Sequence, residues 1–309
     1  MFFEQKYINE EINALINEKN VNVISFATKS TRVLDIKAIA KFTSKTSYYI
    51  IEYNPILDTF TVSSDENRSY GLTNETSDFL NTIDSSATLI IDITNVDIRF
   101  LGILLYNLKK MNFCRVICLY ITPNKYNKNK DYLSDSFEEE NKFDLYNNMG
   151  IKRGINGYLV DNCENLREKN FILLGFEGDR ANSLCGEADI TPVPVVTLPA
   201  IKPGWQNYAL VANRNILKKL TSRNSIEYIS ADSIVSIYNK MQDWKDTYCE
   251  NFLRISPLGT KINALGVLLF ILNNPKSYDI LYDNPIETKS NSSGVDKYFY
   301  YDITEFLNN

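Results

Sequence analysis

The chain contains no histidine among its 309 residues. Without an imidazole there is no His general base, no Ser-His-Asp or Cys-His catalytic arrangement and no His metal ligand. Its 5 cysteines are odd in number and form no Cys-x-x-Cys pair. We therefore expect reduced, mostly buried thiols rather than a disulfide framework, as is usual in cytosolic proteins.

Long hydrophobic runs are also missing. No apolar stretch approaches the about 20 residues of a membrane-spanning helix, and residues 1–20 carry acidic side chains where a signal peptide has cations. The formal net charge of -5 argues against broad nucleic-acid binding, although a local basic pocket remains compatible with it. We expect a cytoplasmic protein that does not associate with membranes.

What is present is an alternation of apolar runs and helical patterns. The segments ATLIIDIT (87–94) and RVICLYITP (115–123) are almost continuously apolar, which is typical of strands buried on both faces of a sheet. Helical spacing follows at 97–112 and, in the second half, at 260–274. The pattern predicts an α/β fold of two Rossmann-like units with mostly parallel sheets.

A charged segment, residues 124–150, divides the chain. We expect residues 1–150 to form the first Rossmann-like unit, with an N-terminal helix over 1–20 and this segment as a polar loop. Residues 151–309 then form the second unit. The polar segment is interpreted as a linker or solvated excursion, with a gating loop as the alternative.

The two halves resemble each other. LGILLYNL (101–108) aligns with LGVLLFIL (265–272), and the strands that follow end in Tyr-x-x-Pro at 120–123 and 282–285. The repeat predicts an internal duplication with a pseudo-two-fold relation. Each unit then presents a strand-to-helix turn at the carboxyl edge of its sheet, where ligands usually bind in such folds.

The turn of the second half reads SPLGTK (256–261). Gly259 allows a turn that a side chain would block, and Thr260 can cap the following helix. Lys261 adds a charge to the positive end of the helix dipole, which favours an anion such as phosphate. The alternative is a plain capped turn with an exposed lysine. The two-glycine spacing of a P-loop is missing, so an NTPase is not predicted.

The corresponding turn of the first half reads DITNVDIR (92–99). Asp92 stands at the end of a buried strand, Asp97 is a plausible helix opener and Arg99 lies one turn into the helix. These side chains could contact a ligand, or Asp92 could be a metal carboxylate. The alternative is an N-cap followed by a surface arginine.

A third turn, GFEGDRA (175–181), also follows a buried strand. Arg180 could fork onto a phosphate, and Glu177 or Asp179 could accept a ribose hydroxyl. Glu177 and Asp179 could instead hold Mg²⁺. The alternative is a glycine-made turn with an internal Asp–Arg pair.

Aromatic side chains open the helical pattern at 206–220. Trp205 or Tyr208 could stack on a base, with Asn213 and Arg214 one to two turns further along. The alternative is a tryptophan that fills the core.

The stretch SPLGTKINALG resembles the ligand turn of CARF-type and SAVED-type domains, Rossmann-like sensors of oligonucleotide signals in CRISPR and anti-phage defence. SAVED domains look like two fused CARF units, which agrees with the repeat. The resemblance covers mainly 252–285 and, less closely, 87–123. By position it implicates Gly259, Thr260 and Lys261, and at the first-half turn Thr94 and Asn95.

The leading hypothesis is a cytosolic nucleotide- or oligonucleotide-binding sensor, or a subunit of a prokaryotic anti-phage defence system. It would signal through a protein partner or a homo-oligomer, since no fused effector motif is recognisable. One alternative is a Mg²⁺-dependent enzyme acting on nucleotides or nucleic acid, with Asp92, Glu177 and Asp179 as catalytic candidates. The other is a non-catalytic scaffold subunit of a defence complex.

Overall fold

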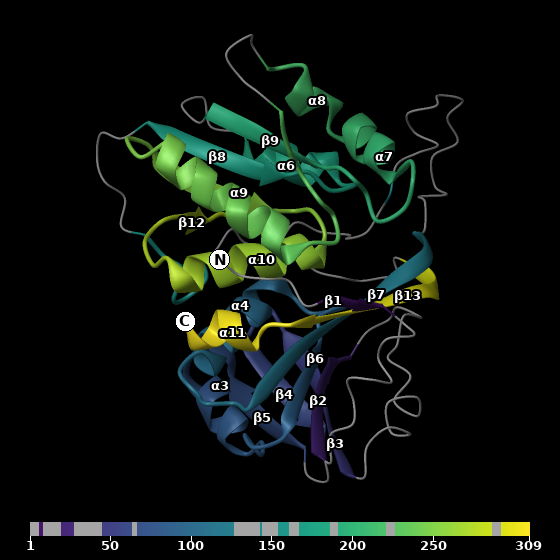
Figure 1. Cartoon of the computed structure of the whole chain (residues 1–309), viewed down its shortest axis with the longest axis vertical. Coiled ribbons are helices and arrows are strands. Elements are labelled where there is room, and N and C mark those ends of the chain that lie inside the picture. The colour runs from purple at the N-terminus through teal and green to yellow at the C-terminus, as the bar shows by residue number, and fades with distance from the viewer. Residues whose placement is uncertain are drawn as a thin grey trace. The chain divides into compact units, whose positions relative to one another are not determined.

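The computed structural model describes residues 6–8, 20–27, 45–63, 67–126, 143, 154–160, 167–185, 191–220, 226–285 and 292–309. The fold is mixed α/β with two sheets, as predicted (Figure 1). The chain divides into unit 1, Met1–Tyr126 with Lys289–Asn309, and unit 2, Asn127–Thr288. The predicted division at residue 150 differs from this one, because the last strand joins the first sheet.

Unit 1 holds an eight-stranded sheet in the order β1-β13-β7-β6-β2-β3-β4-β5. Its four central strands, β7, β6, β2 and β3, are parallel, whereas both flanks are antiparallel. The prediction of mostly parallel sheets is therefore wrong for this unit, since the short turn after Asn54 can only join antiparallel strands. The strands are β1 (Lys6–Ile8), β2 (Asn20–Phe26), β3 (Lys45–Asn54), β4 (Thr59–Ser63), β5 (Arg68–Gly71), β6 (Thr88–Asp92), β7 (Arg115–Tyr126) and β13 (Ser292–Asp302).

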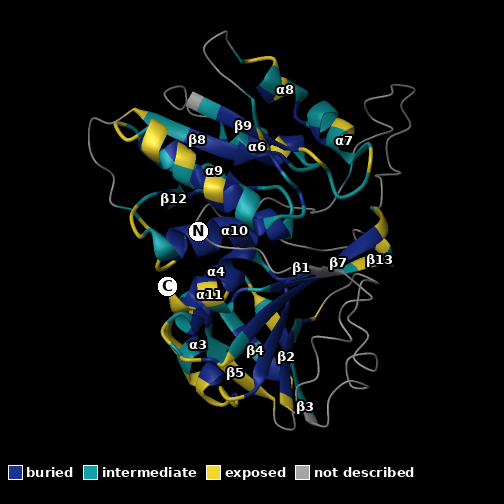
Figure 2. Cartoon of the chain, viewed as in Figure 1, coloured by how far each residue is buried: buried dark blue, intermediate teal, exposed yellow. Residues whose placement is uncertain are grey.

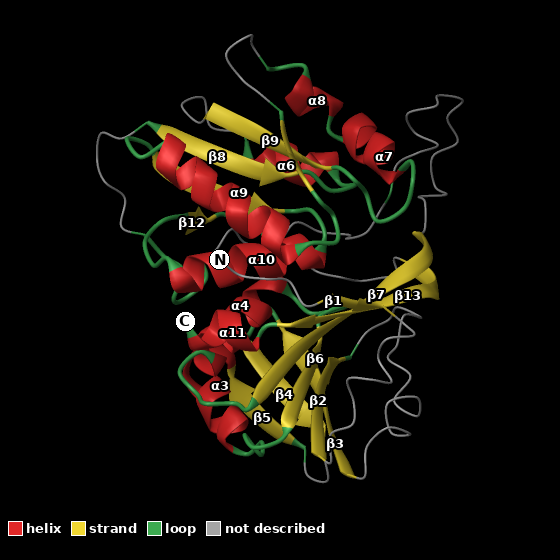
Figure 3. Ribbon diagram, in the orientation of Figure 1, coloured by secondary structure: helices red, strands yellow, loops and turns green. Residues whose placement is uncertain are grey.

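Helices α3 (Leu72–Asn81) and α4 (Ile98–Leu108) pack on one face of this sheet, and α11 (Thr304–Asn308) follows β13 (Figure 3). The Phe60 ring on β4 meets Phe79 of α3 and Phe100 of α4 edge-on, at centroid distances of 5.7 and 5.1 Å. These aromatic contacts fix both helices against the hairpin formed by β3 and β4.

Two predictions about the ends of the first half need correction. Residues 6–8, expected within a helix, form β1 and pair antiparallel with β13, and the other residues of 1–19 lie outside the described part. β7 runs past Pro123 to Tyr126, where it pairs with Ser292. The rest of the predicted polar loop lies outside the described residues, Phe143 excepted.

Unit 2 holds a five-stranded sheet in the order β10-β9-β8-β11-β12, in which every pair is parallel. Counted along the chain, this is the Rossmann order 3-2-1-4-5. The chain leaves β8 on one side and returns on the other with β11, which makes the β8–β11 boundary the topological switch point. The strands are β8 (Glu168–Leu173), β9 (Thr191–Thr197), β10 (Glu227–Ile229), β11 (Phe252–Pro257) and β12 (Asp279–Ile280).

Helices cover both faces of the unit 2 sheet (Figure 1). On one face Phe171 of β8 stacks on Trp244 of α9 (Ile234–Thr247), with centroids 4.2 Å apart. On the other, Ile172 clusters with Ala181 of α6 (Gly178–Leu184) and Ile216 of α8 (Arg214–Leu217). The helix predicted over 206–220 is therefore interrupted at Asn213, between α7 (Trp205–Ala212) and α8.

Helix α10 (Lys261–Asn273) is apolar all round, and every residue from 262 to 272 is buried (Figure 2). It follows β11 as α4 follows β6. The parallel strands also have matching orders, β3-β2-β6-β7 in unit 1 and β9-β8-β11-β12 in unit 2. The two repeated Leu-rich segments thus occupy equivalent places. The duplication itself stays a prediction, because equivalent topology does not demonstrate common origin.

The four cysteines that the structure describes are less buried than expected. Cys118 is buried and Cys185 half-buried, while Cys114 and Cys249 are exposed, and these four thiols are free. Burial raises the pKa of Cys185 to about 11, so its thiol stays protonated at neutral pH.

Candidate functional site

The candidate site is the carboxyl edge of the unit 2 sheet, at the switch point between β8 and β11. Here the turn after β8 touches the turn after β11. A Cβ added to Gly175 would lie 2.2 Å from the carbonyl oxygen of Leu258, so only glycine fits at position 175 without a shift. Open α/β sheets bind their ligands at such a point.

Gly259 does not have the steric role that the sequence suggested. A Cβ at this position would meet Leu173 Cβ at 3.4 Å, an ordinary contact, and Gly259 is not among the glycines with positive φ. The expectation that a side chain would be blocked at 259 is therefore wrong. The steric constraint of this contact falls on Gly175 instead.

Thr260 caps α10, as predicted. Its Oγ1 accepts from Asn263 N at 3.1 Å and lies 2.9 Å from Ala231 O, to which it can donate. Asn263 Nδ2 donates to Ser230 O at 2.8 Å. The start of α10 is thereby tied to the turn after β10.

Lys261 is the first residue of α10 and is half-buried. The helix has 13 residues, so its N-terminus carries a developed positive dipole end. Lys261 and the helix N-terminus thus both bring positive charge to this corner of the sheet edge.

Arg180 is held by two carboxylates. Its Nε and Nη2 fork onto Asp283 at 2.8 and 2.6 Å, and its Nη1 donates to Glu177 at 2.9 Å. Arg180 is 8% exposed and Asp283 1% exposed. The sequence analysis did not single out Asp283, because it places 282–285 at the end of a strand, whereas β12 is only Asp279–Ile280. It stands beyond a strand end, the usual place of functional carboxylates.

This arrangement bears on the Mg²⁺ hypothesis. Glu177 contacts the Arg180 guanidinium, and Asp179 is exposed on α6. Within the described part of the chain, no three acidic or cysteine side chains come together in a way that would hold a metal ion. A guanidinium between Glu177 and Asp283 already supplies the positive charge that a cation would bring.

An aromatic cluster stands beside the turn after β8. It consists of Phe143, Phe176, Trp205 and Tyr208, all half-buried. The Phe176 ring stacks on Phe143 with centroids 4.9 Å apart and meets Trp205 edge-on at 5.7 Å. Lys202 Nζ lies 5.4 Å from the centre of the Trp205 ring. Trp205 is thus neither a fully buried core residue nor an isolated surface ring.

Asn213 joins the Phe176 turn to α7. Its Nδ2 donates to Gly175 O at 2.8 Å and to Ala209 O at 2.7 Å. Asn213 is fully buried, and its Oδ1 has no hydrogen-bond donor among the described residues. Leaving a buried acceptor unsatisfied costs about 1–3 kcal/mol.

The turn after β6 in unit 1 uses its polar groups differently. Asp92 Oδ1 accepts from Thr94 N at 2.9 Å, and Thr94 Oγ1 accepts from Ile121 N at 2.9 Å. Asp92 and Thr94 are both buried, while Asn95 is half-buried. Asp92 therefore accepts a hydrogen bond within its own turn, and Thr94 accepts one from the backbone of β7.

Arg99, expected as a ligand contact or a surface arginine, is only 7% exposed. Its Nε and Nη2 fork onto Asp58 at 3.1 and 2.7 Å, in the turn between β3 and β4. Burial acts to raise the pKa of Asp58, but the hydrogen bonds and charge of Arg99, together with hydrogen bonds from Tyr53 and Thr73, outweigh it, so the net pKa is lowered. Asp97 caps α4 by accepting from the backbone N of Arg99 and Phe100.

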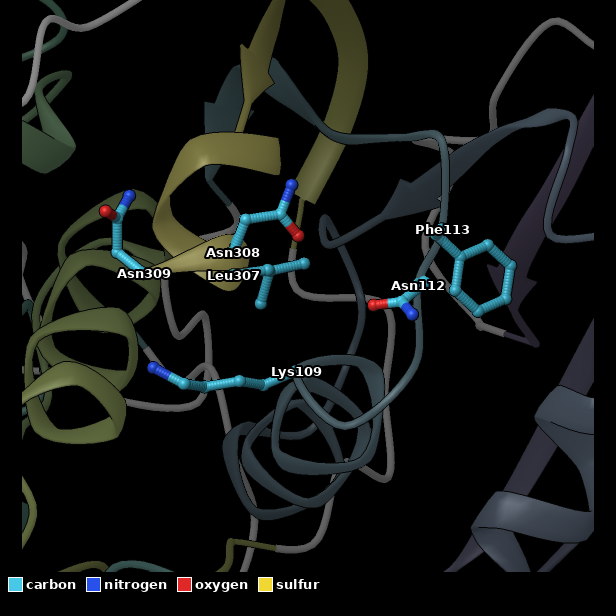
Figure 4. Close-up of a pocket in the computed structure, with 6 residues that line it drawn as sticks. All are labelled: Lys109, Asn112, Phe113, Leu307, Asn308 and Asn309. Carbon is cyan, nitrogen blue, oxygen red and sulfur yellow. The ribbon is translucent and has the colours of Figure 1, made fainter.

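Unit 1 also has a pocket of about 360 Å³. Figure 4 shows Lys109 and Asn112 on one side of it and residues 307–309 on the other. It lies where α4 ends, hence away from the strand carboxyl ends at which α4 begins. Because α4 and α11 both end here, their negative dipole ends disfavour a phosphate despite Lys109. Burial lowers the pKa of Lys109.

No family model matches the chain, and no curated protein matches its sequence. Among the helices that the structure describes, none combines the length and the apolar character needed to cross a bilayer.

Proposed function

We propose that the chain binds a nucleotide or a short oligonucleotide at the carboxyl edge of the unit 2 sheet, and acts as a sensor. The observation that carries this proposal is the contact between the turns after β8 and β11. It makes the aromatic cluster, through Phe176, a neighbour of the Lys261 corner. A nucleotide needs this pair of features, because it joins a flat base to an anionic phosphate.

The phosphate would lie at the N-terminus of α10. The positive dipole end and the Lys261 ammonium act on the same anion there. The base would stack on a ring of the aromatic cluster, an interaction worth about 1–3 kcal/mol per base.

The contacts at this site support a binding protein better than an enzyme. Glu177 and Asp283, two carboxylates at this edge, both contact Arg180. A carboxylate whose oxygens are engaged by a guanidinium has fewer lone pairs left to coordinate a metal ion. The resemblance to CARF-type and SAVED-type domains adds the suggestion that the ligand is a defence signal passed on to a protein partner.

Native mass spectrometry of the purified chain, with and without a nucleotide extract, tests the proposal first. We expect an added mass in the mononucleotide to short oligonucleotide range. Lys261→Ala should weaken binding of that ligand about tenfold, since a charged hydrogen bond to phosphate is lost.

The control variant is Lys218→Ala, an exposed lysine at the end of α8. Both variants should keep the unfolding free energy within about 0.5 kcal/mol of the wild type. Equal loss of affinity in both, or no loss in Lys261→Ala, would contradict the proposed phosphate position.

A further inference from the structure

The segment that forms α7 and α8 is positively charged, although the whole chain has a net charge of -5. Between Asp189 and Glu227 the sequence has no acidic residue. The cations of this stretch are Lys202, Arg214, Lys218, Lys219 and Arg223, of which the first four lie in the described part of the chain. Lys218 and Lys219 are exposed at the end of α8. A local positive surface on an acidic protein is typical of a site for a polyanion.

The acids of the neighbouring helix do not cancel this charge. Helix α6 packs on α8 through Ala181 and Ile216. It carries the exposed Asp179, and Glu177 at its N-cap shares the Arg180 guanidinium with Asp283. A net of two negative charges thus stands beside the four described cations, so the α7–α8 surface keeps an excess of positive charge.

Aromatic rings lie on the same helices as the cations. Trp205 and Tyr208 are three positions apart on α7, which places them on one side of that helix. Both rings are half-buried, so part of each is open to solvent, and Lys202 Nζ lies 5.4 Å from the centre of the Trp205 ring. Single-stranded nucleic acid needs cations for its phosphates and open rings for its unpaired bases, whereas a duplex hides its base faces.

We infer that α7 and α8 form a binding track for single-stranded nucleic acid. Its bases stack on Trp205 and Tyr208, and its phosphates contact the cations between Lys202 and Lys219. Helices of 8 and 4 residues span up to about 18 Å, which is room for a few nucleotides. The track shares the aromatic cluster with the proposed function but needs no phosphate at Lys261, so the two proposals can fail separately.

Oligonucleotides of different length test the track. The probes are fluorescein-labelled trithymidylate, dodecathymidylate and a duplex of the same twelve-nucleotide length, each titrated with the full chain and followed by fluorescence anisotropy. Dodecathymidylate should bind at least about tenfold more tightly than either of the others. With four cations on its phosphates, the logarithm of its association constant should fall with the logarithm of salt concentration with a slope of about -3.

A pair of variants assigns this salt dependence to α8. The double variant Lys218→Ala, Lys219→Ala should bind dodecathymidylate more weakly and reduce the slope by about 1.4. Its affinity for trithymidylate should not change, because a ligand this short stays at the Lys261 corner, and Lys218→Ala therefore remains a control there. Lys109→Ala, Lys110→Ala removes an equal charge from adjacent lysines at the end of α4 and should keep the wild-type slope.

The outcomes separate the two proposals. Equal affinity for the three probes, or an unchanged slope in the α8 double variant, would overturn the track and leave nucleotide binding standing. Duplex binding as tight as that of dodecathymidylate would show a surface that attracts any polyanion, which also overturns the inference. A slope reduced by the α8 variant, together with no effect of Lys261→Ala on trithymidylate, would support the track and refute the proposed phosphate position.

Discussion

The turns after β6 and β11 occupy equivalent places in the two units, yet their cations are used differently. In unit 1, Arg99 is buried and forks onto Asp58, which fixes the β3–β4 hairpin to α4. In unit 2, Lys261 is half-buried at the N-terminus of α10, and the cap Thr260 ties the helix to the turn after β10. The same strand-turn-helix arrangement thus places its cation in a buried ion pair in unit 1 and in a half-buried position at a helix N-terminus in unit 2.

The largest effect is expected where unit 2 holds its own buried ion pair. Asp283→Asn keeps the shape of the side chain but leaves the buried Arg180 without its bidentate partner. We expect the unfolding free energy to fall by about 3–5 kcal/mol, measured by urea denaturation.

The matched control for that variant is Asp243→Asn, an exposed aspartate on α9. It should change the unfolding free energy by no more than about 0.5 kcal/mol. A loss below about 1 kcal/mol for Asp283→Asn would mean that the Arg180 network does not hold this edge together.

Gly175 and Gly259 lie on opposite sides of the contact between the two turns. Replacing each by alanine should give different losses of stability, both smaller than the loss for Asp283→Asn. Gly175→Ala places a methyl group 2.2 Å from the Leu258 carbonyl oxygen, so the turns must move apart, whereas Gly259→Ala makes an ordinary contact at 3.4 Å. We expect a loss of about 1–3 kcal/mol for the first and less than about 1 kcal/mol for the second. Thermal unfolding of the two variants measures this, and similar losses would contradict the description of the switch point.

The smallest effect is a pH dependence that belongs to unit 1. The pKa of Asp58 is lower in the folded than in the unfolded state. Its contribution to the free energy of unfolding is therefore complete above the unfolded pKa and is lost as pH falls through the folded pKa. Asp279, which pairs with Arg254 in unit 2, has a raised pKa because burial outweighs that arginine. The contribution of Asp279 to the free energy of unfolding changes in the opposite sense, because it falls as pH rises above the unfolded-state pKa of this residue.

The check is the unfolding free energy between about pH 5 and about pH 3 in the wild type and in Asp58→Asn. The variant should lose less stability on acidification than the wild type does. Parallel curves would show that the Arg99–Asp58 pair has no influence on acid stability.

Local pattern was sufficient to predict the buried strands, α4, α10 and the Thr260 cap, because each depends on neighbours within a few residues. It was insufficient wherever the partner is distant. Asp283 lies 103 positions from Arg180, and nothing in the spacing of GFEGDRA indicates it. The steric constraint at Gly175 comes from the Leu258 carbonyl in another turn, and for the same reason the sequence misassigned it to Gly259.

The position of β13 has a consequence for the order in which the protein can be completed during synthesis. This strand lies between β1 and β7, and Ser292 pairs with Tyr126, although all of unit 2 separates them in sequence. A ribosome therefore releases β1 and β7 long before the strand that joins them exists. Unit 2 is continuous in sequence, so its five strands can pair while the sheet of unit 1 still lacks β13. The pairing of β13 with β7, which closes a loop across the 162 residues of unit 2, then comes last.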